Sequence, residues 1–408
     1  MSDAVKIAVI GGGPAGMLAA IKAVATLDRA GVADAGEKVV LFDKNDILGR
    51  KIYLTGRGRC NITNTRPWSD FSQHIHPDKG FLKHAFRSFS NEDVMRFFEE
   101  LGVPVIVLQG QRVFPASLKA ADVARALEKR IHALGIDVRK ESVDLNRFMS
   151  LLSEGPVVLA TGGKSYPMTG STGDGYQFAS GAGHTVTSLF PSETALMPKE
   201  YNRDLEGLEM KNVGLSLFID KDMVQREEGD FIFTDDGLES GIAYKISRRA
   251  VWAMVNGQKV EVVLDLKPAL SLEKLSVRIA RDVTEMPGKP RMRSLLRGLM
   301  PERMIDPFIS ANPGLDIENL APRLKEWRFR ISGYKGYERA VVTAGGVSLK
   351  EVSQKTMESK IKPGLFLAGE VLDLDGDTGG YNLQIAFSTG ALAGCSAAKR
   401  LLTFFQAD

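Results

Sequence analysis

The sequence predicts an α/β protein in which a nucleotide-binding fold is interrupted by a long insertion and then resumed. A glycine-rich turn lies between an expected strand and an expected helix at residues 5–20, and a second segment rich in glycine and acidic residues lies at 363–394. Residues from about 190 to 330 show a different pattern, in which alternating strands are followed by helices. We therefore expect both ends of the chain to build one domain around one long ligand.

The first turn has the composition of a dinucleotide-binding turn. Residues 5–10 are an expected buried strand, and Gly11, Gly13 and Gly16 follow it in the spacing G-x-G-x-x-G, before a helix that begins near Pro14. In such a turn the first glycine allows the tight bend, the second lets a pyrophosphate approach the backbone, and the third lets the helix pack closely on the strand. The phosphates then face the positive end of the helix.

An acidic residue follows the second expected strand, at residues 38–42. This residue, Asp43, lies 27 positions after Gly16, slightly beyond the usual spacing of about 20, and the loop at 28–37 accounts for the excess. Its carboxylate can accept the hydroxyl hydrogens of an adenosine ribose. Because an acid at this position disfavours a 2′-phosphate, we do not expect NADP to be the resident ligand.

Three further segments narrow the dinucleotide to FAD. Residues 48–64 form an expected loop, too rich in glycine and polar groups for a packed element, that should lie on the ligand. A short buried strand at 157–160 ends in Thr161, Gly162 and Gly163, and a last strand is expected at 365–368. No long apolar strand leads into the glycines at 170–183, and no acid follows a second strand after them, so NAD(P)H is expected only as a transient electron donor.

The insertion predicts a barrel followed by a helical cap. Its expected strands are 213–219, 230–234 and 259–266, and its expected helices are 271–283, 291–299 and 317–327. Residues 340–347 return to the main fold. The predicted domains are the first part of the FAD-binding domain at 1–190, the barrel-like domain at 191–270, the helical cap at 271–328, and the second part of the FAD-binding domain at 329–408.

Composition indicates a soluble globular protein. The chain has 408 residues, of which 44% are hydrophobic and 25% charged, and a net charge of only +3, which favours neither nucleic acid nor an anionic membrane as a main partner. Two distant cysteines exclude a C-x-x-C pair and favour a reducing compartment. The sequence has no basic leader and no apolar run of about 18 residues. We expect a cytoplasmic protein with a small-molecule substrate; its oligomeric state is left open.

The chain also resembles a known family. The stretches LGRKIYLTGRGRCNITN, RVFPASLKAADV, VVLATGG, VTAGGVSLKEV and TMESKIKPGLFLAGEVLDLDGDTGGYNLQIAF, spread over nearly its whole length, are similar to those of the bacterial HI0933-like flavoproteins, which include aminoacetone oxidase-like enzymes and BaiN-type reductases. The resemblance implies a glutathione-reductase-like FAD (Rossmann) domain with an inserted β-barrel-like domain and a small helical cap. It also implies tightly bound, non-covalent FAD.

The resemblance further implies which residues contact the cofactor. A helix that starts near residue 380 would point its N-terminus at the flavin pyrimidine, where its partial positive charge stabilises the reduced flavin. A short stretch at 143–157 stands where related flavoproteins have a three-stranded meander. The implied contacts are Gly11, Gly13, Pro14, Ala15 and Gly16 at the pyrophosphate; Asp43 and Lys44 at the adenosine ribose; Gly49, Lys51, Gly58, Arg59, Cys60 and Asn61 along the flavin; Val143, Ala160, Thr161 and Gly162 at the adenine half; and Gly369, Glu370, Gly380, Tyr381, Asn382, Gln384 and Ile385 in the C-terminal element.

Three residues are the candidates for catalysis at the flavin face: Lys51, Tyr381 and Asn382. Tyr381 is either a proton donor or a packing wall. Cys60 is interpreted as structural, because it has neither a resolving cysteine nor a histidine nearby in the sequence. The five histidines show no metal-ligand spacing, so no metal is expected, and the pair His74 and His76 is interpreted as a loop feature.

Three functions compete. The leading hypothesis is an FAD-dependent oxidoreductase that transfers a hydride between flavin N5 and a small organic substrate, with NAD(P)H as the transient electron donor. The first alternative is an amine oxidase of the aminoacetone type that uses oxygen. The second is a non-catalytic flavin-binding sensor or partner protein that docks through the arginines at 291–303, although a solvated helix face is the simpler interpretation of that cluster.

Overall fold

The computed structural model describes residues 6–235, 237–286 and 291–405. The chain forms two compact units. One comprises the residues up to Phe190 together with those from Val342 onward, and the other runs from Pro191 to Val341. The second unit therefore includes residues 329–341, because the strand β15 (Trp327–Tyr334) belongs to the barrel, whereas the predicted domain list ended the helical cap at residue 328.

The core of the first unit is a parallel sheet of five strands with β1 in its centre. Four of the five strands are short, buried apolar runs, as expected when both faces of a parallel sheet are covered, whereas the edge strand at 137–139 is half-buried and carries two charged residues. The edge strand β17 comes from the far end of the chain and pairs with β8, so the two pieces of this unit share one sheet. The sheet order is β17 (Leu365–Leu367), β8 (Val157–Leu159), β1 (Ile7–Ile10), β2 (Val39–Phe42) and β7 (Asp137–Arg139).

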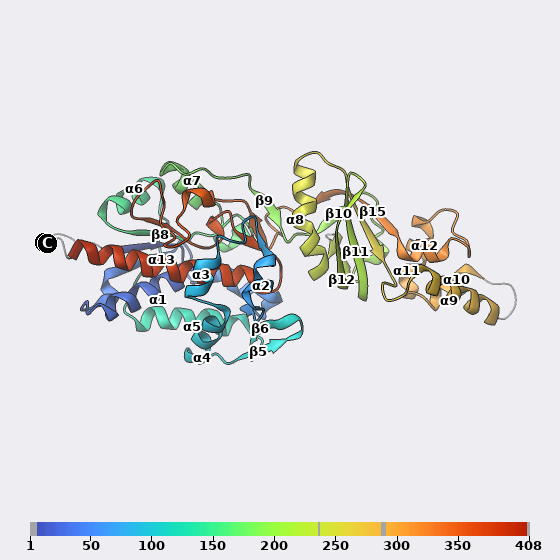
Figure 1. The fold of residues 1–408 in the computed structure, drawn as a ribbon, viewed down its shortest axis with the longest axis horizontal. Coiled ribbons are helices and arrows are strands. Elements are labelled where there is room, and N and C mark those ends of the chain that lie inside the picture. Colours follow the sequence, from blue (N-terminus) through green and yellow to red (C-terminus); the bar gives the residue numbers. More distant parts are fainter. Residues whose placement is uncertain (1–5, 236, 287–290, 406–408) are drawn as a thin grey trace. The chain divides into compact units, whose positions relative to one another are not determined.

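Two long helices hold the ends of the chain together. Helix α1 (Pro14–Arg29) lies alongside α13 (Tyr381–Phe405), as Figure 1 shows. A Cβ on Gly390 would lie 2.3 Å from the carbonyl oxygen of Ala15, and one on Gly394 would lie 2.0 Å from that of Ala19. The two glycines, one helical turn apart, therefore let the helix backbones touch.

Smaller elements complete the first unit. Helix α4 begins with a capping box between Ser90 and Asp93. A three-stranded sheet contains β3, β6 and β5, and a two-stranded sheet pairs β4 with β18. The bounds are η2 (Arg50–Gly58), β3 (Thr63–Asn64), α2 (Trp68–Phe71), β4 (Ile75–His76), α3 (Lys83–Ser88), α4 (Asn91–Glu100), β5 (Val105–Leu108), β6 (Arg112–Pro115), α5 (Ala120–Ala133), α6 (Leu145–Glu154), α7 (Asp174–Gly181), β9 (Phe190–Ser192), β16 (Val342–Ala344) and β18 (Asp375–Gly376).

The second unit is a closed six-stranded barrel with a group of helices at one end (Figure 1). Its interior is apolar and aromatic, with Phe231, Phe233 and Trp327 almost fully buried. The barrel order is β10 (Leu196–Pro198), β13 (Gly237–Glu239), β12 (Asp222–Thr234), β11 (Glu209–Ile219), β14 (Val260–Asp265) and β15. Its helices are α8 (Gly241–Val255), α9 (Leu272–Glu285), α10 (Met292–Arg297), α11 (Glu302–Ala311) and α12 (Leu320–Lys325).

Most expected elements are present, and the differences have local causes. The expected loop at 48–64 contains the 3₁₀ turns of η2, broken at 55–57 where two residues take left-handed backbone angles. The short stretch at 143–157 is the amphipathic helix α6 rather than strands. Helices α8 and α11 have no counterpart in the sequence prediction, and the expected helix at 317–327 ends early because β15 begins at Trp327. None of the described helices is long and apolar enough to cross a membrane.

Candidate functional site

The glycine-rich turn has the geometry that its sequence predicts. Gly11 has a φ of +105°, and a Cβ there would lie 2.4 Å from the carbonyl oxygen of Ala160. A Cβ on Gly16 would lie 1.8 Å from the carbonyl oxygen of Gly11, so α1 packs directly on the turn. At Gly13, by contrast, a Cβ would meet nothing within 4 Å. The turn is closed by its first and third glycines and open at its second, where no side chain caps the helix.

Asp43 braces this turn. One carboxylate oxygen accepts a hydrogen bond of 2.6 Å from the backbone of Gly12, and the other accepts bonds from the backbone and side chain of Asn45 at 2.7 and 2.9 Å. The carboxylate therefore lies beside the open position at Gly13. The neighbouring Lys44 turns to α7, where its ammonium donates to Asp174 and to Thr172, each at 2.6 Å.

The two ends of the chain meet again in an ion pair between Lys51 and Glu370. Their charged atoms are 2.9 Å apart, and each side chain is 22% exposed. The other carboxylate oxygen of Glu370 accepts a bond of 2.8 Å from the backbone of Thr343. A Cβ on Gly163 would lie 2.8 Å from the Glu370 carboxylate, so this position requires the glycine. The loop after β1, the loop after β8 and the loop after β17 therefore converge at one edge of the sheet.

Two buried polar atoms in loops of the first unit, one after η2 and one after β8, have no partner among the described residues. They are Asn61 Oδ1 and Thr161 Oγ1. A buried polar atom without a hydrogen bond costs about 1–3 kcal/mol, so native proteins nearly always satisfy such groups. Gly162, next to Thr161, takes a left-handed φ of +74°. These residues fit a polar ligand that supplies the missing hydrogen bonds, as the dinucleotide expected from the sequence would.

At the start of α13, the side chains of Asn382 and Gln384 form hydrogen bonds with other parts of the protein. The amide of Asn382 is bound to Gly376 at both ends, with its oxygen accepting from the backbone N–H and its nitrogen donating to the carbonyl, each at 2.8 Å. Gln384 is fully buried; its amide accepts from Thr63 and donates to Phe89 and Ser388. Both side-chain amides are therefore engaged by the protein itself.

A histidine and aspartate cluster beside Tyr381 is the feature that the sequence interpretation missed. The carboxylate of Asp377 contacts His74 Nδ1 at 2.8 Å and His76 Nε2 at 3.0 Å. The ring of Tyr381 stacks on His74, with centroids 4.5 Å apart, and packs against Phe71 at 4.8 Å. The pairing of β4 with β18 brings these segments together, so His76 belongs to a strand rather than to a loop. Their separation of about 300 positions gave the sequence no local signal.

The surroundings set the acidity of two of these groups. Burial alone would raise the pKa of Asp377, but the hydrogen bonds with His74 and His76 outweigh it and lower that pKa to about 2. Burial raises the pKa of the Tyr381 phenol above its ordinary value. Asp377 is therefore a carboxylate at neutral pH, while Tyr381 stays protonated. Among the residues that the structure describes, no group of histidine, cysteine and acidic side chains is arranged to hold a metal ion.

The remaining residues predicted to contact the cofactor lie on the same unit and differ in how deeply they are buried. Gly49 precedes η2 with a left-handed φ of +66°, and Gly58 ends it. The guanidinium of Arg59 lies over the ring of Phe114, 5.4 Å from its centroid. Burial raises the pKa of the wholly buried Cys60 thiol to about 12, which agrees with a structural role. Three predicted contacts are buried in the apolar core, namely Val143, Ala160 and Ile385.

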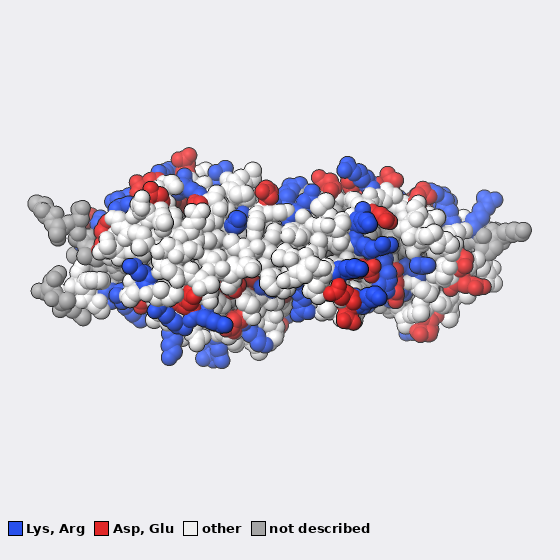
Figure 2. Space-filling model, turned by 90° about the horizontal axis from the view of Figure 1, so that it is seen from above, with Lys and Arg blue, Asp and Glu red and all other residues white. Residues whose placement is uncertain are grey.

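The basic cluster at 291–303 is largely neutralised by its neighbours. Arg293 pairs with Asp306 and Glu302, and Arg297 contacts the same Glu302 at 2.8 Å. Arg303 donates to the carbonyl groups of Asp204 and Glu206. Figure 2 shows the wider pattern on one face, where blue Lys and Arg side chains lie beside red Asp and Glu side chains. The cluster is therefore a paired surface and not a free basic patch.

The family model for the HI0933-like protein Rossmann domain matches residues 5–396. The chain belongs to the HI0933-like family. This confirms the resemblance and the predicted Rossmann-type fold with its inserted barrel. It also places the chain among the FAD-dependent oxidoreductases, as the sequence predicted, in agreement with a curated relative that is named as a reductase.

Relatives of this HI0933-like chain span its full length. It is 28% identical to a 3-dehydro-bile acid delta(4,6)-reductase of Clostridium scindens, over 97% of this chain and 99% of the relative. It is also 28% identical to a ribosomal RNA dihydrouridine synthase of Haemophilus influenzae, over 96% and 98% of the two chains. Among solved structures, a 3-ketosteroid-delta4-(5alpha)-dehydrogenase of Rhodococcus jostii aligns with a TM-score of 0.49 at 12% identity, over 96% of both chains.

Proposed function

We propose that this chain is an FAD-dependent reductase of a small molecule, which it hydrogenates at a carbon–carbon double bond conjugated to a carbonyl group. The observation that carries the cofactor assignment is the convergence of both chain ends on one site. That site has an open glycine turn at Gly13, two orphaned polar atoms, and the pair of Lys51 with Glu370. The chemistry of the named relatives supports the substrate class.

The residues divide among the parts of the cofactor. The open turn at Gly13 and the N-terminus of α1 would hold the pyrophosphate, and Asp43 the adenosine ribose. Thr161 would donate its orphaned hydroxyl near the adenine half, and Asn61 would accept through its amide oxygen on the flavin side. The carboxylate of Glu370, held by Lys51, would face the ribityl hydroxyls. When bound, FAD supplies a hydride from its N5 atom and takes its electrons from NAD(P)H that binds transiently.

The substrate class follows from what the two relatives' reactions share. A delta-4 double bond beside a 3-oxo group is conjugated to that carbonyl, and so is the uridine double bond that is saturated in dihydrouridine. The two names therefore describe one bond type in two carriers, a steroid-like acid and an RNA base. For this chain we favour a small molecule over RNA, because acidic neighbours and backbone carbonyls already engage the arginines at 293, 297 and 303.

Hydrogenation of such a bond needs a proton as well as a hydride. Tyr381 is a weak acid here because burial raises its pKa, so we assign it the role of a packing wall. We assign proton donation to His74, whose ring lies against Tyr381 and is oriented by the Asp377 carboxylate. Lys51 and Asn382 then act as positioning residues, the first through Glu370 and the second through Gly376.

The test is an anaerobic stopped-flow experiment on purified protein loaded with FAD. NADH or NADPH should bleach the flavin band, and a 3-oxo-Δ4 steroid or another conjugated enone should restore it. Restoration by ribosomal RNA alone would replace the small-molecule assignment. Peroxide release on aminoacetone without a nicotinamide would establish the oxidase instead. A flavin that no donor bleaches would contradict the proposal.

His74 can be tested separately from cofactor binding. The variant His74→Gln should leave flavin reduction by NAD(P)H within about twofold of wild type and slow the enone half-reaction by roughly 10²-fold or more, the usual contribution of a general acid. The matched control is His132→Gln, which changes an exposed histidine in the last turn of α5. Equal rates in the two variants would remove His74 from the proton path.

A further inference from the structure

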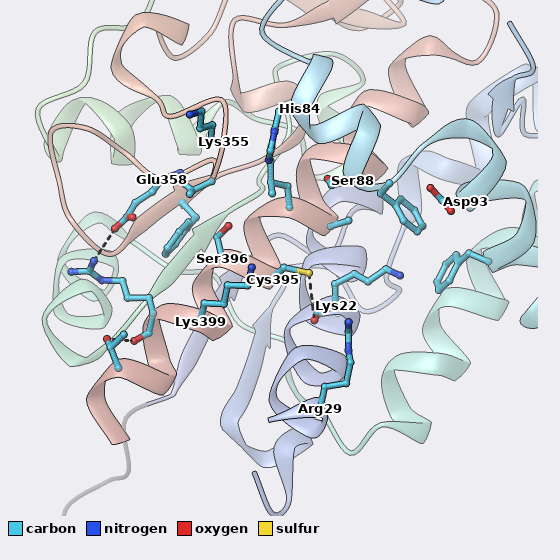
Figure 3. Close-up of a pocket in the computed structure, with 18 of the residues that line it drawn as sticks. Lys22, Arg29, His84, Ser88, Asp93, Lys355, Glu358, Cys395, Ser396 and Lys399 are labelled. Carbon is cyan, nitrogen blue, oxygen red and sulfur yellow. Dashed lines mark hydrogen bonds and ion pairs between the residues drawn. The ribbon is translucent and has the colours of Figure 1, made fainter. Parts of the chain in front are cut away.

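A groove on the first unit lies along the outer sides of α1 and α13. It has a volume of about 780 Å³, a size typical of small-molecule sites. Its floor contains the apolar side chains Phe366, Ala391 and Leu392. Figure 3 shows Lys22 and Arg29 on α1, Cys395, Ser396 and Lys399 on α13, and Lys355 on the loop before β17, all lining this groove. None of these residues belongs to the glycine turn or to the cluster at His74.

The groove concentrates positive charge. Six Lys and Arg side chains line it, against three Asp and Glu side chains, whereas the whole chain has a net charge of +3. Two of the three acids are paired, Asp93 with Arg96 at 3.3 Å and Glu358 with Arg400 at 3.0 Å. The lining of the groove therefore carries a net charge of +3, equal to that of the whole chain.

Four of the cations lack a carboxylate partner within the described part of the chain. Lys355 and Lys399 make no ion pair there, and Arg29 donates only to the carbonyl of Ala25 in its own helix. Lys22 is the most enclosed of them; its ammonium lies 4.4 Å from the centroid of Phe89 and 5.4 Å from that of Phe97. Burial lowers the pKa of Lys22, and the nearby carboxylates of Asp93 and Glu100 offset only part of this effect.

This arrangement selects for a multiply charged anion. Single contacts between exposed lysines and an anion are weak and are screened by salt, so a monovalent ion would gain little here. A ligand with several negative charges can contact the cations of α1, of the loop at 355 and of α13 together, while an organic body covers the apolar floor. The groove is walled by several segments of the chain and is not a flat basic stripe, which favours a small ligand over a nucleic-acid backbone.

We propose that this groove is a second ligand site, separate from the cofactor site, which binds a small polyphosphorylated molecule such as a nucleoside polyphosphate. The proposal is independent of the reaction that the chain catalyses, since it concerns other residues and a different ligand. In Figure 3, Lys399 lies beside Ser396, and Lys22 lies on the other side of Cys395.

The test is calorimetric titration of the full chain, saturated with FAD so that its pyrophosphate site is filled. The probes are inorganic triphosphate and ATP in 0.1 M NaCl. The double variant K355Q/K399Q should weaken binding about tenfold, and raising the salt concentration should weaken it further. The matched control K129Q/K140Q removes two exposed lysines of the same unit that do not line the groove, and should bind within twofold of wild type.

Three outcomes would overturn the proposal. One is the absence of saturable binding of either probe by the wild-type protein. Another is an equal loss in K355Q/K399Q and in K129Q/K140Q, which would indicate attraction to the net charge alone. The third is binding of a single-stranded RNA oligonucleotide that depends on Lys355 and Lys399 while triphosphate and ATP do not bind. Thermal unfolding of both double variants serves as the control for misfolding, because each should unfold at the temperature of the wild type.

Discussion

The turn between β1 and α1 and the start of α13 are both glycine-rich helix starts, yet the sequence predicted them unequally well. At the first, each of Gly11, Gly13 and Gly16 has the surroundings expected of its place in the motif. At the second, Asn382 and Gln384 bond to the protein, and the rings of His74 and Tyr381 stack on each other. The first site is made by one contiguous segment, and the second by segments about 300 positions apart.

A sequence motif predicts the role of each residue best where one contiguous segment makes the site. In a contiguous turn, backbone geometry fixes the role of each position, because a Cβ at the wrong place collides with a fixed carbonyl. At the start of α13, the β4–β18 pairing decides which side chains face one another. Four predictions test this contrast.

The largest effect is expected from Gly16→Ala. Its Cβ would lie 1.8 Å from the Gly11 carbonyl, so we expect a loss of about 3 kcal/mol or more in the free energy of unfolding. In the matched variant Gly13→Ala the Cβ meets nothing, and the apoprotein should unfold as the wild type does while FAD dissociates more readily. Denaturant titration and flavin retention measure the two effects. Equal destabilisation by both variants would contradict the division of roles.

The next effect tests the ion pair that joins the chain ends. In a double-mutant cycle with Lys51→Met and Glu370→Gln, we expect a coupling energy of about 1 kcal/mol, since both side chains are partly exposed and the pair is weakened by solvent. The unfolding free energies of the four proteins give this value. If the two single substitutions changed the free energy of unfolding additively, the ion pair would contribute no coupling energy to stability.

The third prediction concerns acid stability at the missed cluster. The pKa of Asp377 is about 2 in the folded protein and about 3.9 when unfolded, so its contribution is present above about pH 4 and is lost as the pH falls towards 2. With a side chain 19% exposed, the contribution is of order 2 kcal/mol. Asp377→Asn should remove this part of the pH dependence.

Urea midpoints measured between pH 2 and 6 check the acid-stability prediction. The control is Asp46→Asn, which neutralises an exposed carboxylate on the same unit and should leave the profile unchanged. If the urea midpoints of Asp377→Asn and the wild type changed with pH in parallel, the two histidines would not lower the pKa of Asp377 in the folded protein.

The smallest effect is expected from Tyr381→Phe. Tyr381 is buried, and its ring packs against Phe71 and His74. Its hydroxyl makes no hydrogen bond to any residue in the described ranges. If the ring is a packing wall, the variant should change the rate of enone reduction by less than threefold and stability by less than about 1 kcal/mol. A loss of roughly 10²-fold in that rate would make Tyr381 the proton donor and remove the assignment to His74.

Elements with local signals could be predicted from the residues alone. The apolar run before Gly11, the spacing of the three glycines and the acid after the second strand fixed the dinucleotide turn. Alternation of apolar residues located three barrel strands, and α9 and α10 were found near their observed places. These predictions held because strand and helix periodicity, and the steric needs of a tight turn, depend on residues within about one turn of each other.

Contacts between distant side chains could not be predicted from the sequence and depend on how the elements pack. The pairing of β4 with β18 places Asp377 between His74 and His76, and the close contact of α1 with α13 through Gly390 and Gly394 forms the wall of the charged groove. The same packing buries the Gln384 side chain. Contacts between residues 300 positions apart leave no periodic trace along the chain, because they depend on where the sheet and the helices carry the backbone.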